Sequence, residues 1–197
     1  MLLKVCGITR REDLEAVARI GADYAGFILA EGSPRRVTEE RAQALLERCR
    51  ALGMKGVLVV RDLPLESLQG LLGRLKPDVV QLHGSESPEY ASSLMGVEVW
   101  KAFRLLDDRA LEEAVHFPAQ VALADSGGGT GRPCSWPLAR ELSARRRIFL
   151  AGGLNPGNLR EAICQVRPDG VDLSSGVESA PGIKSLTKLQ QLGECLK

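Results

Sequence analysis

The sequence predicts an α/β fold: a single-domain (β/α)₈ barrel with short loops that spans residues 1–197. Short apolar runs alternate with amphipathic stretches along the whole chain, and there are eight of each. Strands and helices that alternate with short connections form a parallel sheet. No linker, low-complexity tract or charge block divides the chain. Eight units in 197 residues leave about 25 residues per unit, the small end of the range for a TIM barrel.

The eight strand candidates are bounded by turn or charged residues and are mostly rich in Val, Ile, Leu or Ala. This composition is typical of strands that helices cover on the outside. In chain order the candidates are residues 2–6, 24–29, 56–60, 79–82, 98–103, 120–125, 148–151 and 170–174.

The helix candidates lie between these strands, and several begin with a recognisable cap. Thr38, Ser87-Pro88, Asp107 and Asn155-Pro156 place an oxygen acceptor or a proline where the first N–H groups of a helix lack partners. The predicted helices are residues 10–20, 38–52, 64–75, 86–95, 107–115, 135–143, 155–165 and 182–195.

A doubly wound open sheet has the same alternation and is the alternative architecture. Two observations favour the barrel. No Gly-x-Gly-x-x-Gly motif opens the first helix, and polar, Gly-rich segments follow many strands instead of gathering at one point. In a barrel all eight strand ends meet on one face, where the chemistry takes place.

Composition and charge argue against several classes of function. The net charge of +1 gives no global attraction to nucleic acid or to an anionic membrane. No apolar run reaches the roughly 18 residues of a spanning helix, and the first residues do not resemble a secretory signal, so we expect a cytoplasmic protein. The five cysteines include no CxxC pair and there are two histidines, so we expect no metal and no disulfide framework. Cys49, Cys164 and Cys195 fall in helical patterns and are expected to be buried.

Strand periodicity places several reactive side chains inside the barrel. Lys4 and Cys6 share one side of the first strand, Asp125 ends the sixth, and Asp172 shares a side with Ser174 in the eighth. A thiol and a carboxylate at the same end of a barrel form an acid/base pair, and Lys4 could lower the thiol pKa. The alternatives are that Cys6 is an inert buried thiol and that Asp125 orders a loop.

Three Gly- or Ser-rich segments indicate an anion site. Asp125 is followed by a run that contains Gly128 and Gly129, and two further segments, at the ends of the seventh and eighth strands, contain Gly152, Gly153, Ser174 and Ser175. Barrels commonly bind phosphate between the loops after these two strands, where backbone N–H groups approach the anion. We therefore expect a sugar-phosphate ligand.

Six motifs, in order along the chain, resemble the signatures of phosphoribosylanthranilate isomerases. They span essentially the whole sequence and read Lys4-Val-Cys-Gly-Ile-Thr9, Ser33-Pro-Arg35, Gln81-Leu-His-Gly84, Asp125-Ser-Gly-Gly-Gly-Thr-Gly131, Ala151-Gly-Gly-Leu-Asn-Pro156, and Gly170-Val-Asp-Leu-Ser-Ser-Gly-Val-Glu178 with Pro181-Gly-Ile-Lys184.

The resemblance implies a cofactor-free Amadori rearrangement in tryptophan biosynthesis, with Cys6 as general base and Asp125 as general acid. It also implies that Arg35 contacts the anthranilate carboxylate, because a planar guanidinium matches a carboxylate. Arg36 has the same chemistry, and only the position of Arg35 in the Ser-Pro-Arg motif favours Arg35 over Arg36. We expect Lys4, His83 and Asp172 to contact the substrate as well, although a structural role for His83 is the alternative.

Two other functions fit the same barrel. One is another sugar-phosphate reaction, such as epimerisation or indole-ring closure; metal-dependent epimerases need more His and carboxylate ligands than this chain supplies. The other is a non-enzymatic phosphate-binding or structural barrel, in which Cys6 and Asp125 could be replaced without loss. The sequence is compatible with a monomer or a homodimer.

Overall fold

Eight parallel strands pair in chain order and close into a barrel, which confirms the predicted fold class. The computed structural model describes residues 1–125 and 135–196. Closure joins the two ends of the chain, because β1 pairs with β8 in a register that places Lys4 opposite Asp172. The strands are β1 (Leu2–Cys6), β2 (Tyr24–Ile28), β3 (Lys55–Val60), β4 (Val79–Leu82), β5 (Glu98–Arg104), β6 (Val121–Asp125), β7 (Ile148–Leu150) and β8 (Gly170–Leu173).

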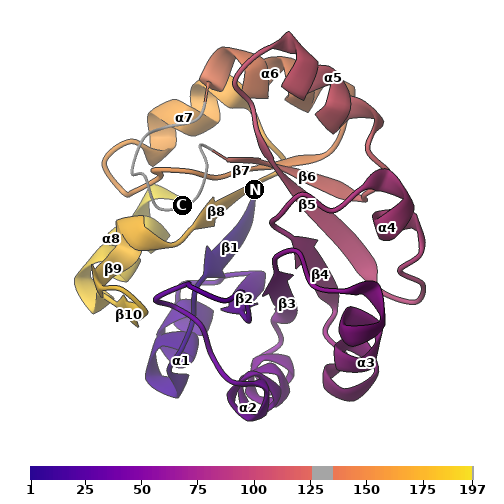
Figure 1. The fold of residues 1–197 in the computed structure, drawn as a ribbon. Helices are drawn as coiled ribbons and strands as arrows, with labels where there is room; N and C mark the ends of the chain where they lie inside the picture. The colour runs from indigo at the N-terminus through magenta and orange to yellow at the C-terminus, as the bar shows by residue number, and fades with distance from the viewer. Residues whose placement is uncertain (126–134, 197) are drawn as a thin grey trace.

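Helices surround the strands, as Figure 1 shows. They are α1 (Arg11–Arg19), α2 (Glu39–Ala51), α3 (Leu65–Leu75), α4 (Pro88–Ser92), α5 (Asp108–His116), α6 (Trp136–Arg145), α7 (Leu159–Val166) and α8 (Leu186–Cys195). The predicted caps at Thr38, Ser87 and Asp107 are confirmed, since each side chain accepts a hydrogen bond from the backbone N–H three residues later. None of the described helices is long and apolar enough to cross a membrane.

The strands separate two apolar cores. Leu3, Val5 and the residues that alternate with them on other strands pack against the helices. Cys6, Tyr24, Trp100 and Phe149 point into the barrel together with valines and Leu123. The rings of Trp100 and Phe149 lie 4.5 Å apart between centroids and fill the interior, so the barrel is a packed core with its chemistry at one end.

The chain between β8 and α8 differs from the prediction. A helix was expected from residue 182, but the segment contains a short 3₁₀ helix, η1 (Ser175–Val177), and a hairpin of β9 (Glu178–Ala180) and β10 (Ile183–Lys184). Gly182 has φ of +78°, which makes the hairpin turn, and α8 begins only after its cap at Ser185. This hairpin contributes to the site described below.

Two smaller expectations were wrong. Helix α7 begins at Leu159 and not at 155, because the Asn155 side chain accepts a hydrogen bond from the Gly157 N–H and forms a turn instead of a cap. Of the three cysteines expected to be buried, Cys49 is buried, Cys195 is partly buried and Cys164 is exposed. A helical pattern alone did not fix which face each cysteine occupies.

Candidate active site

A cavity of about 580 Å³ opens at the carboxyl ends of the strands. Most of the predicted site residues that the structure describes line it: Cys6, Arg35, His83, Asp125, Gly152, Gly153, Asp172, Ser174 and Ser175. Gly128 and Gly129 lie outside the described residues. Side chains from strands far apart in the sequence therefore meet in one cavity, as barrel topology requires.

Cys6 ends β1 and is 7% exposed. Its neighbour in the sheet is Gly26, and a Cβ atom at that glycine would lie 2.7 Å from the Cys6 sulfur, so the missing side chain makes room for the thiol. Burial raises the pKa of Cys6 above its ordinary value, although Lys4 acts to lower it. Lys4 thus acts on the thiol in the expected direction, but desolvation outweighs the nearby cation and the net pKa is raised.

Lys4 lies beneath the cavity and does not line it. Its side chain is fully buried, and its ammonium donates to Asp172 Oδ2 at 2.6 Å. Burial by itself lowers the pKa of Lys4, but the charges of Asp172 and Cys6 outweigh burial and raise it. Lys4 is therefore a buried cation that holds Asp172, and direct substrate contact finds no support in this geometry.

Asp172 lines the cavity. The residue is 8% exposed, and its Oδ1 atom is buried with no hydrogen-bond partner among the described residues. A buried acceptor without a partner is costly, and a ligand hydroxyl or N–H group would satisfy it.

Asp125 ends β6 and faces His83, which follows β4. The distance from His83 Nε2 to Asp125 Oδ2 is 3.3 Å, and His83 Nδ1 lies 2.9 Å from Gln81 Nε2. With the Gln81 amide donating to Nδ1, the imidazole proton lies on Nε2 and points to the carboxylate; this tautomer is assigned from the hydrogen-bond geometry. His83 thus contacts the predicted acid and also lines the cavity.

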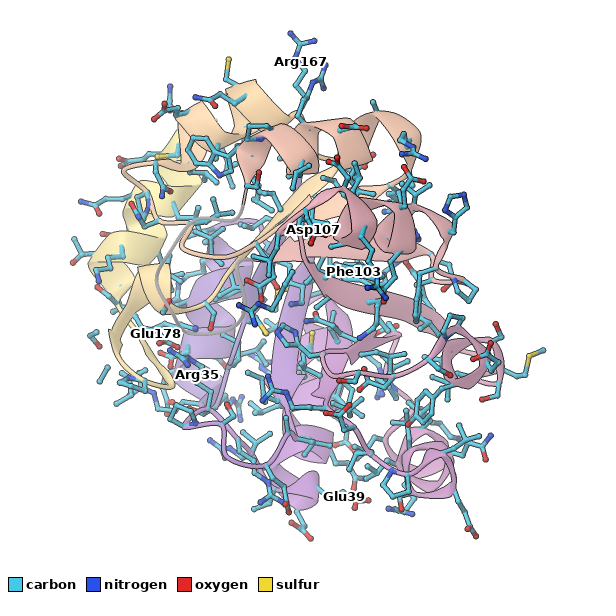
Figure 2. The ribbon with its side chains drawn as sticks, turned by 45° about the horizontal axis from the view of Figure 1, so that its top comes forward. Arg35, Glu39, Phe103, Asp107, Arg167 and Glu178 are labelled. Atoms are coloured by element: carbon cyan, nitrogen blue, oxygen red, sulfur yellow. The ribbon has the colours of Figure 1, made fainter. Side chains whose placement is uncertain are left out.

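Arg35 is held by Glu178 through paired hydrogen bonds, 2.9 Å from Nε to Oε1 and 2.7 Å from Nη2 to Oε2. Figure 2 shows the two side chains next to each other on one side of the molecule. The Arg35 side chain is 16% exposed, whereas Arg36 is 52% exposed and pairs loosely with Glu31 at 3.7 Å. Of the two neighbours, Arg35 lines the cavity.

The loops after β7 and β8 form another wall. Gly152 and Gly153 have φ of +78° and +68°, a conformation that side chains disfavour. A Cβ atom at Gly176 would lie 1.9 Å from the Leu154 carbonyl oxygen, so this glycine lets the two loops approach each other. The result is a wall of backbone and small side chains.

No three His, Cys, Asp or Glu side chains gather into a potential metal site within residues 1–125 and 135–196. The cavity instead contains a thiol, carboxyl groups, an imidazole and a guanidinium. These groups can exchange protons with a ligand and can bind anions.

Residues 3–194 match the family described as N-(5'-phosphoribosyl)anthranilate (PRA) isomerase. The chain belongs to this family. It is accordingly an isomerase of tryptophan biosynthesis. The N-(5'-phosphoribosyl)anthranilate isomerase of Pelobacter propionicus is 38% identical over 194 residues, which cover 96% of this chain and 92% of the relative. That of Agrobacterium fabrum is 39% identical over 95% of this chain and 90% of the relative.

Solved structures of phosphoribosylanthranilate isomerases have the same fold. The Thermus thermophilus enzyme is 41% identical with a TM-score of 0.92, covering 100% of this chain and 98% of that chain. A second structure, in complex with reduced 1-(o-carboxyphenylamino)-1-deoxyribulose 5-phosphate, is 31% identical with a TM-score of 0.88, covering 98% and 97% of the two chains.

Two features of this isomerase site were missed by sequence reasoning. Gln81 is 1% exposed, lines the cavity, and has a buried Oε1 without a partner in the part of the chain described. Gln81 lies two residues before His83, so strand periodicity could have predicted that the two side chains share a side. Gly26 has no comparable signal, because only the register between β1 and β2 places it against Cys6.

Proposed function

We propose that the cavity binds N-(5'-phosphoribosyl)anthranilate and that Cys6 and Asp125 transfer the protons of its Amadori rearrangement. The product is 1-(2-carboxyphenylamino)-1-deoxyribulose 5-phosphate. The observation that carries the proposal is that Cys6 and Asp125 line one cavity, together with Arg35 and the glycines after β7. The relative bound to a reduced form of this product supports the same ligand here.

The first step needs an acid. Protonated Asp125 gives its proton to the furanose ring oxygen, the bond from that oxygen to carbon one breaks, and the anilino nitrogen donates its electron pair to form a Schiff base. His83 Nε2–H donates toward the carboxyl group, orients it, and stabilises the carboxylate that this step creates.

The second step needs a base. The Cys6 thiolate removes the proton from carbon two, and the electron pair moves to the Schiff base to give an enolamine. The enolamine then tautomerises to the ketone, when the oxygen on carbon two loses a proton and carbon one gains one. The reaction as a whole is an isomerisation in which no atoms are added or lost, so the enzyme needs to supply only proton transfer at each step.

The substrate carries negative charge at both ends, and the cavity lining offers groups that suit each of them. The Arg35 guanidinium suits the anthranilate carboxylate. The phosphate suits the backbone near Gly152, Gly153, Ser174 and Ser175. The unpartnered oxygen of Asp172 suits a sugar hydroxyl.

We further propose a cytoplasmic enzyme without a nucleic-acid partner, in line with the net charge of +1. We also propose that the enzyme is a monomer or a homodimer. Cell fractionation tests the location, and sedimentation tests the oligomeric state.

Conservative replacement of the catalytic pair tests the proposal. Cys6→Ser leaves a hydroxyl that stays protonated near neutral pH, and Asp125→Asn cannot deliver a proton. Both should lower kcat by at least about 10²-fold with a much smaller change in product affinity. Because burial raises the pKa of Cys6, kcat/KM of the wild type should rise with pH above neutrality as the thiolate forms. A Cys6→Ser enzyme that retains most of its kcat would remove Cys6 from the role of base.

A further inference from the structure

The β9–β10 hairpin contains a buried charged pair that the reaction described above does not use. Glu178 and Lys184 are opposite each other in the antiparallel register, and their side chains are 5% and 0% exposed. In Figure 1 the hairpin lies next to α8, outside the ring of barrel strands. A buried charge is costly unless its partners compensate it, so the contacts of this pair indicate what the pair holds in place.

Lys184 joins three segments through its ammonium group. Its Nζ donates to the carbonyl oxygen of Cys6 at 2.7 Å, to the carbonyl oxygen of Ser174 at 3.2 Å, and to Glu178 Oε1 at 2.9 Å. An ammonium group has three N–H donors, and these contacts account for all three. One side chain therefore ties the end of β1 to the end of β8.

Glu178 extends this network to the cavity. Its carboxylate accepts from Lys184 on one side and from Nε and Nη2 of Arg35 on the other. None of the described contacts involves Arg35 Nη1. One carboxylate shared by two cations leaves a net positive charge beside the cavity, which favours an anionic ligand group.

The hairpin is fixed to the start of the chain. Thr9 Oγ1 donates to the Gly182 carbonyl at 2.6 Å, and the Lys184 backbone N–H donates to Asp13 Oδ2 at 3.1 Å. Gly7 has φ of +74°, and a Cβ atom at this position would lie 2.6 Å from Arg35 Cδ, too close for a side chain. The glycine at position 7 therefore leaves room for the Arg35 side chain beside the end of β1, close to where the hairpin is attached.

We propose that Glu178 and Lys184 are positioning residues that fix Cys6, Arg35 and the phosphate loop at Ser174 relative to one another. The inference rests on the proposed function, in which Cys6 moves the proton and Arg35 binds the carboxylate. Glu178 acts through Arg35, so it controls substrate affinity. Lys184 acts through the backbone of Cys6 and Ser174, so it also controls the proton-transfer step.

A double-mutant cycle tests the role of Glu178. The variants are Glu178→Gln, Arg35→Ala and the two combined, with Arg36→Ala and the exposed Glu66→Gln as matched controls. The readouts are KM, kcat and the dissociation constant of the reduced product analogue. Arg35→Ala and Glu178→Gln should each weaken analogue binding by about tenfold or more, since each disturbs a charged hydrogen bond. In the Arg35→Ala background, Glu178→Gln should add less than about twofold, because coupled residues are not additive.

A second variant, Lys184→Met, tests the link to Cys6. The titratable and charged groups around this thiol are Lys4 on β1, Asp172 on β8, Lys184 on β10 and Arg35. Lys184→Met should lower kcat as well as affinity, and it should move the rising limb of the pH–rate profile to higher pH because one cation near the thiol is lost.

Equal effects of Glu178→Gln in both backgrounds would overturn the positioning role of Glu178. So would a loss of thermal stability in Glu178→Gln with unchanged KM and analogue affinity. Unchanged kcat and pH profile in folded Lys184→Met would overturn the role of Lys184. Failure of the proposed function is a different result: it would appear as full kcat in Cys6→Ser, whereas the coupling between Arg35 and Glu178 is measured by binding and does not need turnover.

Discussion

Two buried lysine–glutamate pairs lie at the mouth of the barrel, and their chemistry is alike. The Lys101 side chain on β5 is 4% exposed and contacts Glu86, and the Lys184 side chain on β10 is 0% exposed and contacts Glu178. The difference is in what each carboxylate holds besides its lysine. Glu178 holds the cavity-lining Arg35, whereas Glu86 accepts from two backbone N–H groups, those of Asp62 and Gly84.

The hydrogen bonds of the pair on β5 go to the turns after β3 and β4, since Lys101 also donates to the Gly84 carbonyl oxygen. The Lys101 ammonium lies 5.9 Å from the ring centroids of Phe103 and Phe117. The Lys184 pair contacts the backbone of two cavity-lining residues and a guanidinium. The same kind of ion pair therefore stabilises a fold or prepares a binding site, depending on its additional partners.

The largest effect is expected from Lys101→Met. It leaves the Glu86 carboxylate buried without its cation, so the free energy of unfolding should fall by about 3–5 kcal/mol, while KM of the folded enzyme changes little. Chemical denaturation and steady-state kinetics measure the two quantities, and the exposed Lys76→Met is the matched control. A large rise in KM without loss of stability would erase the distinction between the two pairs.

An intermediate effect is expected in a part of the mouth that neither pair contacts. Gly153→Val adds a side chain at a residue with φ of +68° in the loop after β7. If this backbone binds the phosphate, losing a charged hydrogen bond of about 1.5–3 kcal/mol should raise KM at least about tenfold. Unchanged KM and kcat in a folded variant would place the phosphate elsewhere.

The smallest effect is expected on how the stability of the folded protein depends on pH in the acid range. The pKa of Glu178 is lowered: burial acts to raise it, but Arg35 and Lys184 together outweigh burial. A carboxyl group with a lowered pKa in the folded state contributes stability above its unfolded pKa and loses it as the pH falls through the folded pKa. Part of the acid-induced loss of stability should therefore disappear in Glu178→Gln. Thermal unfolding from neutral to acidic pH measures this, and identical pH slopes in the two proteins would contradict it.

Much of the fold was predictable because it depends on local patterns. Alternating apolar and amphipathic segments predicted eight strand–helix units, and the caps at Thr38, Ser87 and Asp107 predicted where three helices begin. The β9–β10 hairpin was not predicted, because residues 182–195 contain a helical pattern and only the turn at Gly182 interrupts it.

Strand periodicity and motif order, which are local properties of the sequence, determined that Cys6, Asp125 and Asp172 would face one end of a barrel. Tertiary structure decided how each group is charged and held. Arg35 and Arg36 are neighbours with the same chemistry, yet only Arg35 reaches a buried carboxylate 143 residues away. Burial outweighs the effect of Lys4 on the Cys6 pKa, and Lys184 binds the Cys6 carbonyl across 178 residues. Desolvation and long-range ion pairs exist only once β8 has closed against β1, so no local pattern contains them.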